Sequence, residues 1–469
     1  MRSCKLSVRM LSKRWNADNG YRAALKIGWP LVISMMSSTV MTFTDRMFLG
    51  NYSLDALGAA LPASIAAFLF LSFFFGVVEY IGVFVSQYTG ACQPERVGSA
   101  LWQGLWFCVP AGLFLASLWF VAEPLFVLGG HPQEIQELEV IYFRILTLGG
   151  GPFLVGICLS CFFAGRGLTK PVMVVNMAAA IINIPLDYCL INGIWLFPEL
   201  GIVGAGIATV CGYILPAICY SFMIFSRKNE ECYRVRSAFR LKPDLFRRFM
   251  RFGLPGGAQF FLDLFAITFF IFMVGRLGEV ELASSNAVFS IYLLAFLPCI
   301  GLHVSASIMV GQAMGGGQPD EAAYATKSVL HLALGYMFVM ATIFVLLPGP
   351  LLELFRTRGE AGADYTAVKD MGVVLLRYAA AFTLIDAVAI VYVGGLKGAG
   401  DTRFTMWCLG IVSLTCMVLP ISLLSSFDVM DVHGPWVCLL VYVSVLATTF
   451  MYRFRKGPWR SIQVIEKTG

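Results

Sequence analysis

Residues 201–226, GIVGAGIATVCGYILPAICYSFMIFS, contain no charged side chain. A helix rises about 1.5 Å per residue, and about 20 consecutive apolar residues are enough to cross the hydrocarbon core of a bilayer. The stretch is therefore predicted to be a membrane-spanning helix. Similar runs recur along the chain and make twelve predicted spans. They lie at roughly 25–49, 54–80, 98–122, 140–164, 171–192, 201–226, 249–274, 282–312, 326–348, 370–396, 404–427 and 433–454.

The composition of the whole chain agrees with these runs. Of its 469 residues, 58% are hydrophobic and 13% are charged, whereas soluble domains have about 45–50% apolar and about 25% charged residues. A large soluble protein would need amphipathic helices with a polar face, and these segments are apolar all round. We expect an all-α integral membrane protein surrounded by lipid in the cell membrane, with a bacterial inner membrane as the favoured location.

The thirteen cysteines are an odd number and fall mostly within the predicted spans. They are interpreted as small apolar packing residues. Cys158 and Cys161 form a C-x-x-C pair, but no His or further Cys is near them in the sequence. The sequence therefore predicts no metal centre and no cofactor beyond a coupling ion.

The net charge of +6 is explained by where the Lys and Arg residues lie. They gather in the two terminal segments and in the loops on one predicted side of the membrane, and the richest loop is 226–252. The opposite loops contain only four basic residues, namely Arg276, Arg356, Arg358 and Lys369. The positive-inside rule then places both termini in the cytoplasm. This distribution accounts for the basic balance without a nucleic-acid partner, and the basic residues 1–22 are interpreted as a cytoplasmic tail rather than a signal peptide.

The two halves of the chain repeat one pattern of small and polar residues. Eight positions in the first half recur 225 residues later, as the pair Pro30 and Pro255 illustrates. They are Gly28, Pro30, Gly50, Gly76, Gln87, Gly90, Gln93 and Pro94, matched by Gly253, Pro255, Gly275, Gly301, Gln312, Gly315, Gln318 and Pro319. The sequence thus predicts two pseudo-symmetric six-helix bundles. The predicted parts are an N-terminal tail over 1–22, an N-lobe over 23–226, a basic linker over 227–248, a C-lobe over 249–455 and a C-terminal tail over 456–469.

Several segments, taken together and in order, resemble the multidrug and toxic compound extrusion (MATE) family. The resemblance extends from about Gly28 to Arg455, and its most specific stretch is GGLKGAGDTR at 394–403. The other matching residues are Pro30, Asp45, Gly50, Ala56-Leu57-Gly58, the stretch VSQYTGA at 85–91, Leu254-Pro255, Val310-Gly311-Gln312 and Asp386-Ala387-Val388. The resemblance implies a monomeric two-lobe secondary transporter. Such a protein exports small organic, often cationic, compounds by antiport with H+ or Na+ and is not an enzyme.

The chain departs from the family at three positions. Asp263 stands where many members have Glu, Asn286 where many have Gln, and Lys397 where Arg is usual.

Charged side chains within the predicted spans indicate a functional site, because a carboxylate at the centre of a span costs about 2.5–3.5 kcal/mol on insertion scales. Asp45 and Asp187 each lie about one and a half turns before the outer end of a span, and therefore at one level. Asn183 is one turn from Asp187, and Thr209 enters the next span from its outer end. Carboxylate, amide and hydroxyl oxygens suit a hard cation such as Na+, and the same acids could carry protons. These four positions resemble the family's cation and proton site in the N-lobe.

The second half offers a comparable set of polar residues. Asp263 and Asp386 lie near the middle of spans seven and ten. By resemblance they are the cation or substrate residues of the C-lobe, and Gln259 and Tyr378 are candidate helpers. The sequence leaves open which set couples transport to an ion, and it leaves open whether either cluster is only structural.

Two titratable residues are predicted near the cytoplasmic ends of spans two and eight. Glu79 and His303 are a candidate pH-sensitive gate, since His titrates near pH 6.5. The alternative is that each is an interfacial residue in water. The glycine pairs Gly165-x-Gly167 and Gly315-Gly316-Gly317 are not followed by the Lys-Ser/Thr of a phosphate loop, so no nucleotide partner is predicted.

Two other functions remain as alternatives. A lipid or lipid-linked oligosaccharide flippase of a related two-lobe fold should have a strongly cationic cavity, whereas the predicted intramembrane charges are mostly acidic. An intramembrane transferase could use Asp428 and Asp431 to bind a metal, but the chain has no second acidic motif of this kind.

The topology is directly testable. A single cysteine placed near residue 235 in a cysteine-free background should react with an impermeant thiol reagent only after the cytoplasmic face is opened. Labelling of intact cells from outside would contradict the predicted orientation.

Overall fold

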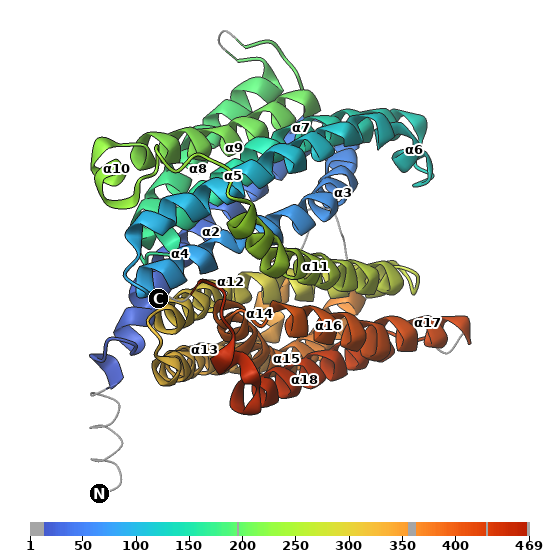
Figure 1. Cartoon of the computed structure of the whole chain (residues 1–469). Coiled ribbons are helices and arrows are strands. Elements are labelled where there is room, and N and C mark those ends of the chain that lie inside the picture. The colour runs from blue at the N-terminus through green and yellow to red at the C-terminus, as the bar shows by residue number, and fades with distance from the viewer. Residues whose placement is uncertain (1–13, 195–196, 355–362, 428–429, 467–469) are drawn as a thin grey trace, which may run out of the picture. The chain divides into compact units, whose positions relative to one another are not determined.

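A computed structural model describes residues 14–194, 197–354, 363–427 and 430–466 of the chain. Over these ranges the regular structure is helical and no strand occurs (Figure 1). Twelve of the helical segments found there are long and apolar enough to cross a membrane. The predicted fold class, an all-α membrane protein with twelve spans, is confirmed.

The chain divides into two compact units. The first unit is Pro30–Ala258, and the second unit combines Met1–Trp29 with Gln259–Gly469. The helices that lie wholly or partly in the first unit are α2 (Tyr21–Tyr52), α3 (Leu54–Glu79), α4 (Ile81–Gly90), α5 (Pro94–Ser117), η1 (Leu118–Val121), α6 (Ala122–Val127), α7 (Gln133–Ala164), α8 (Thr169–Asn192), α9 (Ile202–Ile224), α10 (Arg227–Tyr233) and α11 (Pro243–Val274).

The second unit takes the N-terminal part of α2, the remainder of α11 and the helices that follow it. These helices are α12 (Glu279–Gly315), α13 (Pro319–Leu346), α14 (Pro348–Glu353), α15 (Ala363–Ala399), α16 (Thr402–Ser413), the π-helical turn η2 (Leu414–Val418), α17 (Leu419–Ser426), α18 (His433–Lys456) and η3 (Pro458–Ser461). Within it, α15 packs against α12, α13 and α18, while α7 packs against α3, α5 and α9 in the first unit.

Helices α2 and α11 each pass from one unit to the other. The change falls between Trp29 and Pro30 in α2, and between Ala258 and Gln259 in α11. The lobes predicted from the sequence place each of these spans in one lobe, and those lobe boundaries stay a prediction. Proline removes a backbone donor and bends a helix, so Pro30 in α2 and Pro255 in α11 mark where each helix can change its packing partners.

Glycine permits close packing beside both of these changes. A Cβ on Gly257 would lie 2.4 Å from the carbonyl oxygen of Phe73, which leaves no room for any side chain. A Cβ on Gly28 would lie 3.3 Å from the carbonyl oxygen of Gly301. The N-terminal part of α11 therefore lies against α3 inside the first unit, and the N-terminal part of α2 lies against α12 inside the second.

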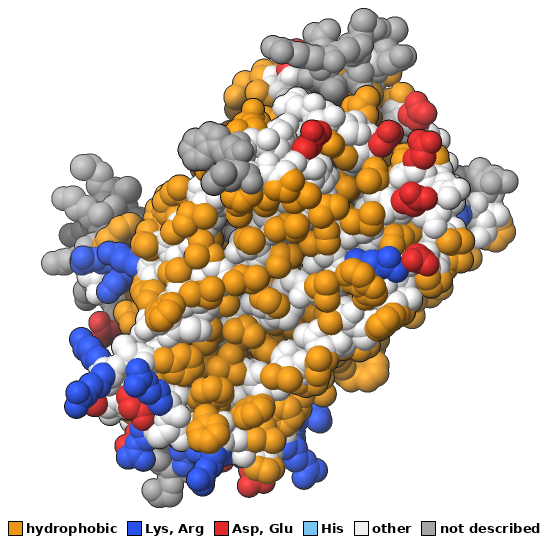
Figure 2. Space-filling view, turned by 90° about the horizontal axis from the view of Figure 1, so that it is seen from above, with side chains coloured by type: hydrophobic (Ala, Val, Ile, Leu, Met, Phe, Trp, Pro, Cys, Tyr) orange, Lys and Arg blue, Asp and Glu red, His pale blue; other side chains and the backbone are white. Residues whose placement is uncertain are grey.

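Large apolar side chains both fill the units and cover their outer surface. Phe143 and Phe162 are buried in the first unit, whereas Phe222 on α9 is 81% exposed. Figure 2 shows a broad band of hydrophobic side chains, with Lys and Arg gathered toward one end of the face and Asp and Glu toward the other. A band of this kind is what lipid chains cover in a membrane protein.

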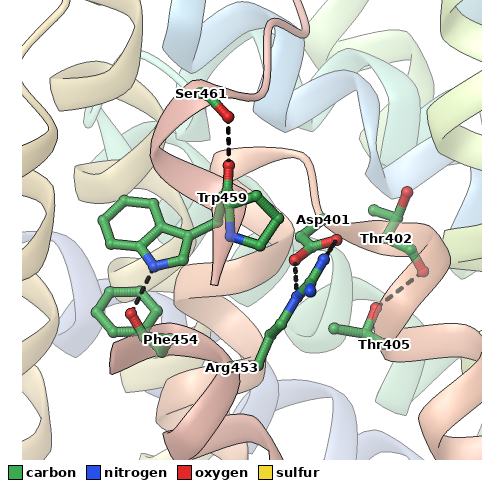
Figure 3. A network of polar contacts seen from close by, with 8 residues as sticks. Asp401, Thr402, Thr405, Arg453, Phe454, Trp459 and Ser461 are labelled. Carbon is green, nitrogen blue, oxygen red and sulfur yellow. Dashed lines mark hydrogen bonds and ion pairs between the residues drawn. The ribbon is translucent and has the colours of Figure 1, made fainter. Parts of the chain in front are cut away.

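An ion pair joins the turn after α15 to the end of α18 (Figure 3). The Nε of Arg453 donates to Asp401 Oδ2 at 2.7 Å, and its Nη2 donates to Oδ1 at 3.3 Å. The following residues continue this packing, since the ring of Trp459 stacks on Phe454 with centroids 4.5 Å apart. Asp401, 6% exposed, belongs to the GAGDTR motif, so one role of this motif is to anchor the C-terminal end of α18.

Replacing Arg453 with Met should destabilise the protein, because Asp401 would keep a buried charge without its partner. We expect the free energy of unfolding to fall by about 2–3 kcal/mol. This is less than the cost of breaking a fully buried ion pair, because the Arg453 side chain is 27% exposed and solvent weakens the interaction. The matched control is Arg460→Met, which removes a 2.8 Å pair to Asp320 in which both side chains are exposed. Thermal unfolding in detergent should show a lower midpoint for Arg453→Met only. Equal midpoints would contradict the anchoring role.

Candidate functional site

The two predicted acids of the first unit meet inside it. Asp45 on α2 is 8% exposed and Asp187 on α8 is 1% exposed. The carboxyl groups of Asp45 and Asp187 lie close enough to interact electrostatically. The structure thus brings together the two aspartates of the first half.

Tyrosine and threonine side chains complete one side of this carboxyl pair. The hydroxyl of Tyr142, on α7, donates to Asp45 Oδ2 at 3.3 Å. Thr209 on α9 lies beside the hydroxyl of the same tyrosine. Thr209 thus reaches the acids through Tyr142.

Asn183 lies one turn from Asp187 on α8 and is almost fully buried. Its side-chain amide donates to the carbonyl oxygen of Ala208 at 2.7 Å, and this residue precedes Thr209 on α9. A Cβ on Gly212 would lie 3.4 Å from the same amide nitrogen, so the small residue leaves space for Asn183 between the helices. Asn183 therefore joins α8 to α9 beside the acids.

The carboxyl pair has more acceptor atoms than the neighbouring donors satisfy. Asp45 Oδ1 and both oxygens of Asp187 are buried and accept no hydrogen bond from any donor in the described ranges. Two carboxylates in apolar surroundings cannot both stay ionised unless a cation or a proton accompanies them. The arrangement is chemically suited to bind H+ or a hard monovalent cation such as Na+.

The second unit contains two aspartates, each held by a tyrosine. The Tyr442 hydroxyl on α18 donates to Asp263 Oδ1 at 3.2 Å. The Tyr292 hydroxyl on α12 donates to Asp386 Oδ2. The carboxyl groups of Asp263 and Asp386 also interact electrostatically, so both predicted acids of this half belong to one polar cluster.

The two predicted helpers of the second unit lie apart from each other. Gln259 is buried and accepts a hydrogen bond of 2.8 Å from the hydroxyl of Thr405 on α16. Tyr378 instead lies beside His433, with 3.5 Å between its hydroxyl and the Nδ1 atom. It is two helical turns before Asp386 on α15, so no contact brings it to the acids.

Glu79 lies beside an interruption of its helical span. Glu79 ends α3, but the same span continues through α4 to Gly90, so this residue is not at the end of the span. His303 lies within α12, and its Nδ1 is 2.8 Å from the carbonyl oxygen of Ile390, to which it donates. The two residues belong to different units, and their pairing as a gate stays a prediction.

Three tyrosines that donate to the acids were not among the predicted site residues, namely Tyr142, Tyr292 and Tyr442. No spacing rule marks them, because Tyr is common near membrane interfaces and each is distant in sequence from its aspartate. Of the alternative acidic pair, Asp428 lies outside the described residues. Asp431 Oδ1 accepts a hydrogen bond of 2.8 Å from the backbone of Gly434, at the start of α18.

Comparison with known proteins gives consistent relatives over nearly the whole chain. The MatE family model matches residues 30–189 and 255–422. A probable multidrug resistance protein NorM of Pseudomonas putida is 28% identical over 453 residues, which is 96% of each chain. The multidrug resistance protein PmpM of Pseudomonas aeruginosa is 29% identical over 391 residues, covering 81% of this chain and 79% of that one.

Solved structures share the fold at lower sequence identity. A MOP superfamily transporter from Pyrococcus furiosus has a TM-score of 0.84 at 18% identity, covering 93% of this chain and 95% of that one. The eukaryotic MATE transporter AtDTX14 has a TM-score of 0.81 at 19% identity, covering 94% and 96%. The family match over most of the chain, with this shared fold and the acids described above, leads to one conclusion: the chain belongs to the MATE family of membrane transporters.

Proposed function

We propose that this chain is a secondary active multidrug efflux transporter that exports small organic, often cationic, molecules in exchange for H+ or Na+. The main support is the buried pair Asp45 and Asp187, whose unsatisfied carboxylate oxygens lie inside an apolar helix bundle. The names of the relatives as multidrug resistance proteins support the same class of substrate. We further propose a monomer with both termini cytoplasmic and no catalytic activity of its own.

The coupling ion is proposed to bind in the first unit. Asp187 accepts no hydrogen bond from the described residues, and Asp45 accepts one from Tyr142 through Oδ2 only. Each aspartate of the second unit accepts one from a tyrosine. An ion gains most where oxygens lack donors, since binding then replaces a costly buried charge rather than an existing hydrogen bond. Asp263 and Asp386 are proposed to contact the organic cation instead.

Exchange requires that ion and substrate favour different states of the protein. Each then weakens the binding of the other by the same factor, because coupling between two sites is reciprocal. The alternative of a lipid or oligosaccharide flippase is not favoured, since the buried polar clusters are acidic while a pyrophosphate group would need cations.

Transport should depend on an ion gradient and need no nucleotide. The proton gradient and the Na+ gradient are imposed separately on inverted membrane vesicles. One of them should drive uptake of a fluorescent organic cation. Collapse of both gradients should stop uptake even with ATP present. Uptake that continues with ATP alone would refute the proposal.

The substitutions Asp45→Asn and Asp187→Asn should uncouple the transporter and leave it folded, because an amide is cheaper to bury than a charge. In the wild type, drug affinity should change by about 5–150-fold when H+ or Na+ saturates the site. Both variants should still bind drug but lose this dependence, as measured by drug titrations of purified protein over pH and Na+ concentration.

The matched controls are Asp263→Asn and Asp386→Asn in the second unit. They should weaken drug binding and keep its dependence on pH or Na+. If the dependence survives in the variants of Asp45 and Asp187 and disappears in the controls, the coupling ion binds in the second unit instead.

A further inference from the structure

The basic segment between α9 and α11 is an ordered structure that packs on α5. We call residues 226–242 the strap. The indole N–H of Trp102 donates to the carbonyl oxygen of Val235. The indole N–H of Trp106 donates to the carbonyl oxygen of Phe239 at 2.8 Å. Val235 itself is fully buried. A Cβ on Gly98 would lie 2.3 Å from the carbonyl oxygen of Tyr233, so the strap backbone lies directly against α5.

A carboxylate holds the strap in its folded shape. Glu230, in α10, accepts hydrogen bonds from the backbone N–H of Arg236 and from the hydroxyl of Ser237. The N–H of Arg236 and this hydroxyl hold the pKa of Glu230 below its ordinary value. The cationic side chains of the strap are therefore attached to a defined backbone.

An apolar groove lies directly beside the strap, between α5, α7 and α9. Its volume is about 290 Å³. Its walls include Trp102, Leu105, Trp106, Val155, Leu159 and Phe225. Two of these walls, Trp102 and Trp106, are the side chains that hold the strap, so the groove and the strap form one continuous surface.

The mouth of the groove is cationic. The Nε of Arg236 donates to the carbonyl oxygen of Phe225 at 2.8 Å, and its Nη2 donates to the same atom. This places a guanidinium, which has five N–H donors in all, at the rim of the groove. Arg240 is exposed and follows Phe239, whose ring centroid is 6.4 Å from that of Trp102. Phe239 is 52% exposed, as is typical of an aromatic side chain at a membrane interface.

We propose that this groove, with Arg236 at its rim and the exposed Arg240 nearby in the strap, binds one anionic glycerophospholipid. An acyl chain lies along the apolar walls between α5, α7 and α9, and the phosphate of the head group is bound by Arg236 and Arg240. Guanidinium groups bind phosphate through paired hydrogen bonds, and basic pockets between membrane helices fit anionic head groups. The choline of a zwitterionic lipid would place a positive charge near these arginines. The site is distinct from the carboxyl pair and does not depend on which ion couples transport.

The experiment measures lipid binding to the full-length purified protein by native mass spectrometry in detergent. Phosphatidylglycerol and phosphatidylcholine with the same acyl chains are compared. The wild type should prefer phosphatidylglycerol, and added salt should reduce that preference, since exposed charges are screened. Equal binding of the two lipids would overturn the proposal.

The double variant Arg236→Gln and Arg240→Gln should weaken phosphatidylglycerol binding about 30-fold, because each cation that contacts the phosphate contributes about a fivefold gain in affinity. The matched control, Arg227→Gln with Lys228→Gln, removes the same charge from exposed residues of α10 and should bind as the wild type does. Equal losses in both double variants would show only diffuse attraction and would overturn the site.

The single variant Arg240→Gln protects the test against misfolding of the strap. The backbone carbonyl oxygen of Arg240 accepts a hydrogen bond from the side-chain amide of Gln103. The substitution leaves this carbonyl group in place. We expect about a fivefold loss of phosphatidylglycerol binding with an unchanged thermal midpoint. Unchanged binding in this variant and in the double variant would refute the role of the arginines.

The groove is tested by filling it. Val109→Trp adds a large ring to a groove wall. The matched control, Val174→Trp, adds the same ring on α8, away from the groove. The two valines have similar exposure, 54% for Val109 and 58% for Val174. Phosphatidylglycerol binding should fall for the first variant only. If both variants bind as the wild type does, and inorganic phosphate competes fully for the site, it is a simple anion site and the proposal is wrong.

Discussion

In a hydrocarbon environment no water is available to bind backbone N–H and C=O groups, so every helix must satisfy its own. The architecture of this chain follows from that constraint. Its spans are helical, and Ser and Thr side chains bond back to carbonyls of the preceding turn, as Ser37 does to Ile33 at 2.9 Å. Polar groups that the backbone does not satisfy are then confined to a few places, and those places contain the candidate sites.

Interruptions of the helices are placed where packing changes. Pro30 and Pro255 lie at or near the points where α2 and α11 leave one unit for the other. In the second unit the π-helical turn Leu414–Val418 ends two residues before Pro420 in α17. A wider turn spaces the carbonyls away from the proline ring, which would otherwise clash with the preceding turn. Proline and glycine thus set the path of helices whose apolar surface is otherwise uniform.

The two units treat their buried acids differently. In the first, Tyr142 donates to Asp45, while Asp187 accepts no hydrogen bond from the described residues. In the second, Tyr442 and Tyr292 each donate to one aspartate. A tyrosine hydroxyl stabilises a carboxylate by hydrogen bonding without adding charge. Ionisation of the first pair is the more costly, because its oxygens have fewer hydrogen-bond donors. For this reason we propose that the coupling ion binds there.

From the order of its residues alone, the sequence predicts the membrane environment, the twelve spans and the family, because these depend on the length of apolar runs and on motifs that are local in the chain. It also placed Asp45 level with Asp187, since depth along a helix can be counted in residues. The folded structure was needed to show that three tyrosines donate to the acids. It was also needed to place Tyr378 beside His433. It further shows that the helical span of Glu79 continues after this residue. The structure also revealed the strap packed on α5 and the groove beside it. The physical reason is that rotation about each helix axis is set by packing against neighbouring helices, and helices that are apolar all round carry little local signal of which face turns inward.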